Sequence, residues 1–146
     1  MTDTKDFNPS KVPTDYPLCL NRQCPLASTC LRQLVEQHCN DTAVYWYIIS
    51  PKRIAALQGE CPYYRCSAKV RYAKGMMNML ENMPHKQMCA VIAGLKHLFS
   101  ERTYYRIRKG ERLLFPAEQQ KIYKLLQACG INGRPEFDAY TEDYEW

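Results

Sequence analysis

Residues 84–110, PHKQMCAVIAGLKHLFSERTYYRIRKG, decide the fold that this sequence predicts. In the first half, apolar residues recur at intervals of three and four, the period of a helix with one buried face: Met88, Val91, Ile92, Leu95, Leu98 and Phe99. Ser100 then offers an N-cap for a second helix, and Gly110 is suited to end that helix in the left-handed conformation. The stretch therefore predicts two helices joined by a tight turn.

The second of these helices carries a high density of positive charge. Residues 100–114 hold two adjacent tyrosines and five basic side chains, Arg102, Arg106, Arg108, Lys109 and Arg112. From Arg65 to Arg112 there are eleven Lys or Arg and three Asp or Glu, whereas residues 135–146 hold five acids and no base. This distribution predicts a polyanionic partner for the middle of the chain and an acidic tail that masks or repels it. Alternatively, these charged residues serve only to keep the protein soluble.

The two predicted helices resemble the helix-turn-helix of Cro-type repressors. Gly94 stands where that motif has a small residue at the helix crossing, and Phe99 stands where it has an apolar residue before the second helix. Tyr104 and Ile107, three residues apart, match its two apolar anchors. The sequence departs from the motif at Leu98, where the turn often has glycine. Leucine tolerates a left-handed backbone poorly, so either the turn has another geometry or the first helix is longer.

The resemblance implies that outward side chains of the second helix bind DNA, in preference to RNA. Side chains near the start of such a helix reach base edges, and basic side chains at its end meet phosphates. The residues expected at this interface are Arg102, Thr103, Tyr105, Arg106, Arg108, Lys109 and Arg112. Two alternatives stay open. The helix is a solvated basic face, or the protein is a protein-interaction adaptor whose surface is formed by Tyr104, Tyr105 and the acidic aromatic tail.

Eight cysteines are the second chemical feature of the sequence. The N-terminal segment has no apolar stretch typical of a secretion signal, which favours a cytoplasmic protein with reduced thiols over a disulfide scaffold. Three cysteines fall within CLNRQCPLASTC (19–30), and two more fall within CPYYRC (61–66). Closely spaced thiolates can converge on one metal, so the sequence predicts a four-thiolate site for Zn²⁺ or an iron–sulfur cluster. The expected ligands are Cys19, Cys24, Cys30 and Cys61.

Other features limit this prediction. The spacing differs from the C-x2-C pairs of zinc knuckles and ferredoxins. Cys30 also lies on the apolar stripe of a predicted helix, where a buried cysteine is often structural. His38 and Cys39 are spare candidate ligands, whereas Cys89 and Cys129 fit helix interiors and are expected to be structural. Because no P-loop, G-x-G-x-x-G, G-x-S-x-G or H-E-x-x-H motif is present, the sequence indicates a protein that is not an enzyme.

The pattern as a whole predicts a mainly α protein of the small α+β class. Residues 43–49, AVYWYII, indicate a strand, and a helix is expected to open at Pro25. Further helices are expected in 50–59, in 76–83, and from Pro116 to a stop at Gly130. No apolar run approaches the roughly 18 residues of a membrane helix. We expect a mobile arm (1–17), a Cys-rich module with a short strand (18–66), a helical helix-turn-helix-like module (67–134) and an acidic aromatic tail docked on the body (135–146).

In order along the chain, CPLASTCLR, CPYYR, YYRIRKGERLL, PAEQQKI and FDAYTEDYEW resemble an uncharacterised family of small cysteine-containing cytosolic proteins from anaerobic gut bacteria. The resemblance spans nearly the whole chain from Tyr16 onward. Phe115 departs from the pattern, because a small N-cap residue is expected before Pro116. The resemblance implies no activity, only that the cysteine module and the helical module belong together. The sequence therefore predicts a DNA-binding regulatory protein with a structural metal or iron–sulfur site.

Overall fold

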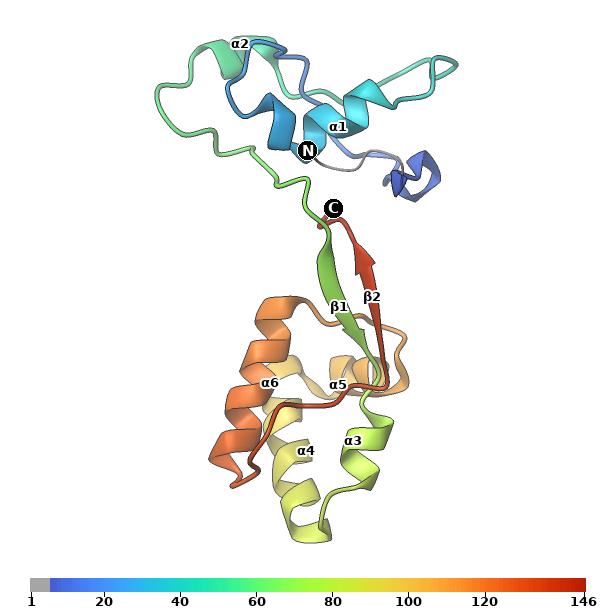
Figure 1. Cartoon of the computed structure of the whole chain (residues 1–146), viewed down its shortest axis with the longest axis vertical. Coiled ribbons are helices and arrows are strands. Elements are labelled where there is room, and N and C mark those ends of the chain that lie inside the picture. The colour runs from blue at the N-terminus through green and yellow to red at the C-terminus, as the bar shows by residue number, and fades with distance from the viewer. Residues whose placement is uncertain (1–5) are drawn as a thin grey trace. The chain divides into compact units, whose positions relative to one another are not determined.

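The computed structural model describes residues 6–146 and divides the chain into two compact units. Unit 1 runs up to Lys69 and also includes Tyr144–Trp146, whereas unit 2 comprises Val70–Asp143. The described residues are mainly helical, with one two-stranded sheet, as the sequence predicted (Figure 1). Within these residues, no helix combines the length and apolar character needed to cross a membrane.

Unit 2 is built from a small antiparallel sheet and four helices. Its elements in chain order are β1 (Val70–Lys74), α3 (Met77–Glu81), α4 (His85–Phe99), α5 (Glu101–Lys109), α6 (Pro116–Ala128) and β2 (Ala139–Asp143). Strands β1 and β2 lie side by side, with Val70 opposite Asp143 and Lys74 opposite Ala139 (Figure 1). Two hydrogen bonds between Ala73 and Leu114, of 3.1 and 2.9 Å, join the segment before α6 to β1.

The core of unit 2 forms where α4, α5 and α6 meet. Each helix buries residues three or four positions apart, so each presents one apolar stripe to the others. The buried residues on these helices are Val91 and Leu95 from α4, Tyr104 and Ile107 from α5, and Ile122 and Leu126 from α6. Phe137, from the segment before β2, completes the same cluster. The predicted stripe on α4 is confirmed at Val91 and Leu95, whereas Leu98 is exposed.

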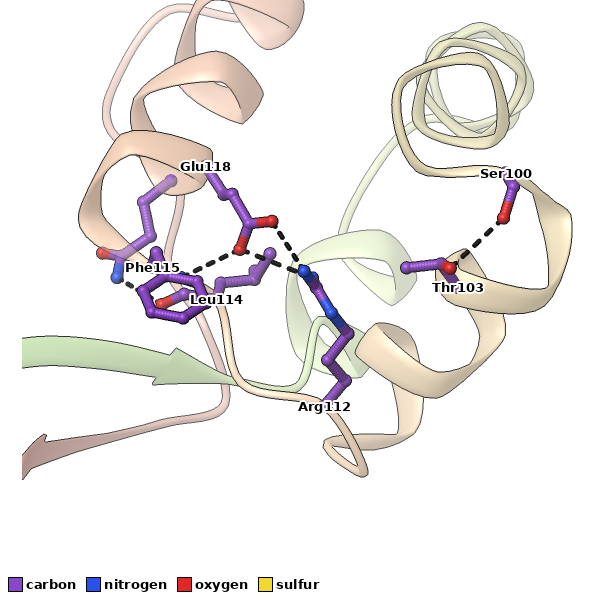
Figure 2. Close-up of polar contacts among 7 residues, drawn as sticks. Ser100, Thr103, Arg112, Leu114, Phe115 and Glu118 are labelled. Atoms are coloured by element: carbon purple, nitrogen blue, oxygen red, sulfur yellow. Dashed lines mark hydrogen bonds and ion pairs between the residues drawn. The ribbon is translucent and has the colours of Figure 1, made fainter. Parts of the chain in front are cut away.

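Local signals place the helix ends of unit 2 where the sequence predicted them. Gly110 and Gly130 both have a φ of 78°, the left-handed conformation that ends a helix. Pro116 occupies the first position of α6, where no backbone donor is needed. The side chain of Phe115 cannot cap this helix. Instead, the Glu118 carboxylate accepts a hydrogen bond from the Phe115 backbone N–H at 3.0 Å (Figure 2).

Glu118→Ala should therefore lower the free energy of unfolding by about 1–2 kcal/mol, the usual cost of losing a helix cap. The substitution also removes the carboxylate that pairs with Arg112 at 2.8 Å. Urea denaturation monitored by circular dichroism measures the loss. Glu118→Gln is the matched control, because its amide oxygen can still accept from Phe115, and it should lose less stability. An alanine variant as stable as the wild type would contradict this role.

The turn between β1 and α3 depends on a residue from the C-terminal segment. The Asp138 carboxylate accepts hydrogen bonds from the backbone N–H groups of Met77, at 2.9 Å, and Asn78, at 2.8 Å. These are free donors in the first turn of α3. Gly75 has a φ of 77°, and a Cβ there would collide with the Asp138 carboxylate. Glycine is thus required at this position for both backbone conformation and close approach.

Unit 1 has little regular structure around a second apolar core. It contains α1 (Leu31–Gln37), α2 (Pro51–Ala55) and 3-10 helices at Pro9–Lys11 and Ala27–Thr29. The helix expected to open at Pro25 therefore begins only at Leu31, after a turn and the second 3-10 helix. The buried residues of this core are Tyr16, Leu18, Leu31, Leu34, Val35 and Tyr144. The last of these comes from the C-terminal end of the chain, beyond unit 2.

Two further predictions for unit 1 differ from the structure. The strand predicted at 43–49 does not form, because this segment pairs only through a single parallel bridge between Leu18 and Ile48. Aromatic and β-branched residues favour a strand only where a partner strand is available. Of the arm predicted to be mobile, residues 1–5 lie outside the described residues, and Tyr16 near its end is buried in the core.

Candidate functional site

Helix α5 has one buried face and one exposed basic face. Tyr104 and Ile107 are buried in the core of unit 2. Arg102, Arg106 and Lys109 are spaced by four and three residues, so they share the opposite side of the helix, and all three are exposed. The side chains of these three residues form no ion pair or hydrogen bond with any of residues 6–146. We call these three residues the outer face of α5.

The acid at the start of α5 is neutralised from α4 and does not offset the outer face. Lys96 donates a hydrogen bond to Glu101, with 2.8 Å between Nζ and Oε1. This hydrogen bond lowers the pKa of Glu101 and raises the pKa of Lys96. The Lys96 ammonium also lies 5.2 Å from the centroid of the Tyr105 ring. Tyr105, 43% exposed, is therefore held beside this ion pair at the edge of the outer face.

The remaining residues predicted to bind nucleic acid have partners within unit 2. Arg112 forms an ion pair with Glu118, and Thr103 accepts a hydrogen bond of 3.2 Å from the Ser100 hydroxyl (Figure 2). Arg108 is half-buried, with its Nε 3.2 Å from the sulfur of Met77. Of the seven predicted residues, Arg102, Arg106 and Lys109 are those whose side chains have no partner in the described part of the chain. The predicted phosphate contacts of Arg108 and Arg112 would compete with these internal contacts.

The connection between α4 and α5 differs from a Cro-type turn. Ser100 is the only residue between the two helices, so the first helix is longer than in that motif. With φ 68° and ψ 158°, Ser100 adopts a conformation that is rare outside glycine and costs about 1–3 kcal/mol. Its side chain does not cap α5, contrary to the prediction. Gly94 was expected at the crossing with α5, but a Cβ there would meet Leu125 of α6.

The four cysteines predicted as metal ligands are brought together in unit 1. Cys19, Cys24, Cys30 and Cys61 line one cavity of about 20 Å³, which we call the thiol cavity. Cys19 and Cys30 are buried, whereas Cys24 and Cys61 are half-buried, and none of the four forms a disulfide. As the side chains stand, no group of three or more His, Cys, Asp or Glu within residues 6–146 is arranged to hold a metal ion.

The other cysteines and histidines do not contribute to the thiol cavity. Its lining includes neither His38 nor Cys39, the two spare ligands, nor Cys66 of the CPYYRC segment. His38 instead uses Nδ1 in a 2.9 Å contact with the backbone oxygen of Leu34. Burial raises the pKa of the Cys39 thiol, and the charge of Glu36 raises it further, so both effects favour the neutral thiol. The four cysteines predicted as ligands are therefore the four that line this cavity.

Arg32 is a notable residue of the thiol cavity that the sequence analysis did not identify. It is only 8% exposed and donates hydrogen bonds to two backbone carbonyls, those of Tyr63 at 2.8 Å and Pro17 at 2.7 Å. The guanidinium lies 5.0 Å from the centroid of the Tyr16 ring. No carboxylate within residues 6–146 pairs with it. Because burial raises the pKa of Tyr16, that hydroxyl supplies no negative charge either.

An exposed apolar segment is the second feature that sequence reasoning missed. The five consecutive side chains of 44–48, VYWYI, are between 41% and 89% exposed. Their composition had indicated a strand, and the same composition could have marked an exposed binding segment. Contiguous exposed apolar side chains are typical of interaction surfaces.

Comparison with known proteins gives a family and no activity. A protein-family model described as a family of unknown function (DUF6078) matches residues 1–146. No curated protein and no solved structure matches the chain. Function must therefore be argued from the arrangement of the residues themselves.

Proposed function

The chain belongs over its whole length to the family of unknown function DUF6078, and we propose that this member binds duplex DNA through the outer face of α5. The proposed role is regulatory and not catalytic. The observation that carries the proposal is the set of three unpaired cations, Arg102, Arg106 and Lys109, on the exposed side of a helix whose other side is buried.

The fixed position of α5 supports this proposal. Tyr104 and Ile107 anchor the helix in the core, so the three cations are presented by a rigid element and not by a loop. Preorganised cations lose less side-chain entropy on binding than cations on a mobile segment. Since Lys96 already neutralises Glu101, the acid at the start of α5 does not oppose an approaching phosphate. Affinity from such contacts arises largely from counterion release and falls with salt.

The helical form of the interface favours DNA over RNA. The major groove of B-DNA is about 12 Å wide and admits an α-helix. The major groove of A-form RNA is deep and narrow, so the side chains of a helix cannot read it. Arg102 and Arg106 lie in the first turns of α5 and could form bidentate hydrogen bonds with guanine. Lys109, in the last turn, is suited to a phosphate contact.

Single substitutions should separate base recognition from phosphate contact. We expect Arg102→Ala and Arg106→Ala to cost about 1–3 kcal/mol on a preferred site and to relax sequence preference there. Lys109→Ala should weaken all sequences alike and reduce the slope of log K against log salt by about one. Fluorescence anisotropy with duplex DNA and with structured RNA, at several salt concentrations, measures both effects.

A charge-matched control distinguishes the outer face from net charge. Lys121→Ala removes one exposed positive charge from α6 in the same unit and should leave affinity nearly unchanged. If Lys121→Ala weakens binding as much as Lys109→Ala, the interaction reflects overall charge and the proposed interface is wrong. RNA bound as tightly as duplex DNA would contradict the groove argument.

Binding of a protein partner is the second candidate function, and the segment 44–48 favours it. Of the adaptor surface expected from the sequence, Tyr104 is buried, as are Phe137 and Tyr144 of the tail, whereas Tyr105 and Tyr140 are exposed. Residues 44–48 offer a different apolar surface within unit 1. If this second function is right, Tyr45→Ser with Tyr47→Ser should abolish binding to a protein partner without changing DNA affinity.

A further inference from the structure

We propose that Cys19, Cys24, Cys30 and Cys61 form a four-thiolate metal centre and that the buried guanidinium of Arg32 balances its negative charge. The metal belongs to the class that prefers four sulfur ligands, either a single Zn²⁺ or an iron–sulfur cluster. This inference is independent of DNA binding by α5, because it concerns unit 1 alone.

The convergence of the thiols is the first observation that supports the metal centre. Cys19, Cys24 and Cys30 come from one loop-rich segment, whereas Cys61 comes from a turn thirty-one residues beyond Cys30. All four line the thiol cavity, although the chain has eight cysteines. The cavity is otherwise lined mainly by apolar and aromatic side chains, including Leu26, Ile49 and Ile54. Apolar surroundings suit soft thiolate ligands.

Arg32 is the second and independent observation. A buried cation without an anionic partner is costly, and proteins avoid it unless a counter-charge is bound nearby. Four thiolates around one Zn²⁺ leave a net negative charge, and thiolate-ligated iron–sulfur clusters are commonly anionic as well. A metal centre in the thiol cavity would supply the counter-charge that no carboxylate within residues 6–146 provides for Arg32.

Binding of a single Zn²⁺ requires the thiols to draw together, whereas a cluster requires the cavity of about 20 Å³ to widen. The described side chains do not already form a site for a metal ion, and Cys24 and Cys61 are half-buried residues of irregular segments that can adjust. When a single Zn²⁺ binds, each thiol releases its proton to solvent as its sulfur bonds to the metal, with no change of oxidation state. A cluster would instead need sulfide with iron in both the ferrous and the ferric state. Because the ligands come from two distant segments, binding would also stabilise unit 1.

The two cysteines of CPYYRC give a matched pair for the test. Cys61 lines the thiol cavity, whereas Cys66, five residues later, does not. Elemental analysis of the full chain purified without oxygen should find about one zinc, or iron with acid-labile sulfide, per wild-type chain. Cys61→Ser should lose this metal, whereas Cys66→Ser and Cys129→Ser should keep it. Zinc without visible absorbance identifies the single ion, and iron with sulfide and visible absorbance identifies the cluster.

A second measurement keeps the proposal testable if Cys61→Ser fails to fold. In the wild type, metal should protect Cys24 and Cys61 from alkylation, as read by mass spectrometry, while Cys66 reacts with or without metal. Chelation should then expose the protected thiols. The proposal is overturned if wild type stays metal-free after incubation with Zn²⁺ and after incubation with sulfide and a mixture of ferrous and ferric iron. It is also overturned if Cys61 and Cys66 react alike.

Two substitutions, one that removes the positive charge of Arg32 and one that keeps it, test whether this charge balances the metal centre. Arg32→Met removes the positive charge but keeps a long apolar side chain, and it should weaken metal affinity by about 10–100-fold, as changes beside a metal's ligands often do. Arg32→Lys keeps the charge and should retain more of the affinity. Metal competition with a chromophoric chelator measures both constants. Equal affinity in the wild type and Arg32→Met would show that the guanidinium does not balance the centre.

Discussion

Deletion of the last three residues, Tyr144–Trp146, is expected to unfold unit 1 while unit 2 keeps its fold. Tyr144 is 6% exposed, and its ring lies 5.8 Å from that of Phe7 and 5.5 Å from that of Trp146. The Trp146 ring also packs edge-on against Tyr16 at 5.6 Å. Removing a buried aromatic side chain typically costs about 3–5 kcal/mol, and a small domain has only about 5–15 kcal/mol of stability.

Hydrogen exchange can locate this effect, because the two units should respond differently. Amides of α1, in unit 1, should lose protection in the truncated chain, whereas those of α4 and α6 should keep it. β2 ends at Asp143, so the truncation leaves every residue of the strand pair in place. Glu145→Ala is the control, since it changes an exposed residue between the two aromatics and should have little effect. Unchanged protection of α1 in the truncated chain would contradict the proposed packing.

Tyr104→Ala should destabilise unit 2 by about 3–5 kcal/mol, whereas Tyr104→Phe should be neutral or stabilising. The ring is 1% exposed and belongs to the core cluster of unit 2. Its hydroxyl is buried and has no hydrogen-bond partner among the described residues. An unsatisfied buried polar group costs about 1–3 kcal/mol, so replacing it with hydrogen removes a penalty.

Urea denaturation of the two variants measures this contrast directly. A large loss in Tyr104→Ala combined with no loss in Tyr104→Phe would show that the ring, and not the hydroxyl, holds α5 in place. A strongly destabilised Tyr104→Phe would mean that the hydroxyl has a partner such as a bound water. A mild effect of Tyr104→Ala would contradict the burial of this face of α5 and, with it, the assignment of the outer face.

The parts of the fold that local chemistry determines could be predicted from the sequence. Gly110, Pro116 and Gly130 mark helix ends because left-handed backbone and a missing N–H have local causes. The apolar stripe that contains Val91 and Leu95 predicted α4. The spacing of three and four residues that defines such a stripe is also a local property of the sequence.

Long-range pairing could not be predicted in this way. β1 and β2 are separated by most of unit 2, and nothing in VRYAK or AYTED specifies the other as its partner. The segment 43–49 has stronger strand composition than either, yet it forms only one bridge because no partner strand lies beside it. Gly94 was assigned to a crossing with α5, although the neighbour that its missing side chain accommodates is Leu125 of α6.

The candidate sites show the same division between local and distant information. Spacing along the chain grouped Cys19, Cys24 and Cys30, three of the four cysteines that line the thiol cavity, whereas Cys61 comes from a distant turn. The exposure of Arg102 and Arg106 follows from the helical period once Tyr104 is placed inside. The partner of Arg112 lies in the next helix and could not be anticipated from a basic cluster alone. The buried position of Arg32 gave no signal in the sequence, because arginine is usually exposed.

The most direct test of the central claim is the affinity of the full chain for duplex DNA at low salt, measured by fluorescence anisotropy. The wild type should bind with a Kd tighter than about 10⁻⁴ M, the weak limit of ordinary non-specific binding, and should weaken steeply as salt rises. The triple variant Arg102→Ala, Arg106→Ala and Lys109→Ala should bind at least about tenfold more weakly with a shallower salt slope. Wild-type binding no tighter than about 10⁻⁴ M, or a triple variant that binds as well as the wild type, would contradict DNA binding by α5.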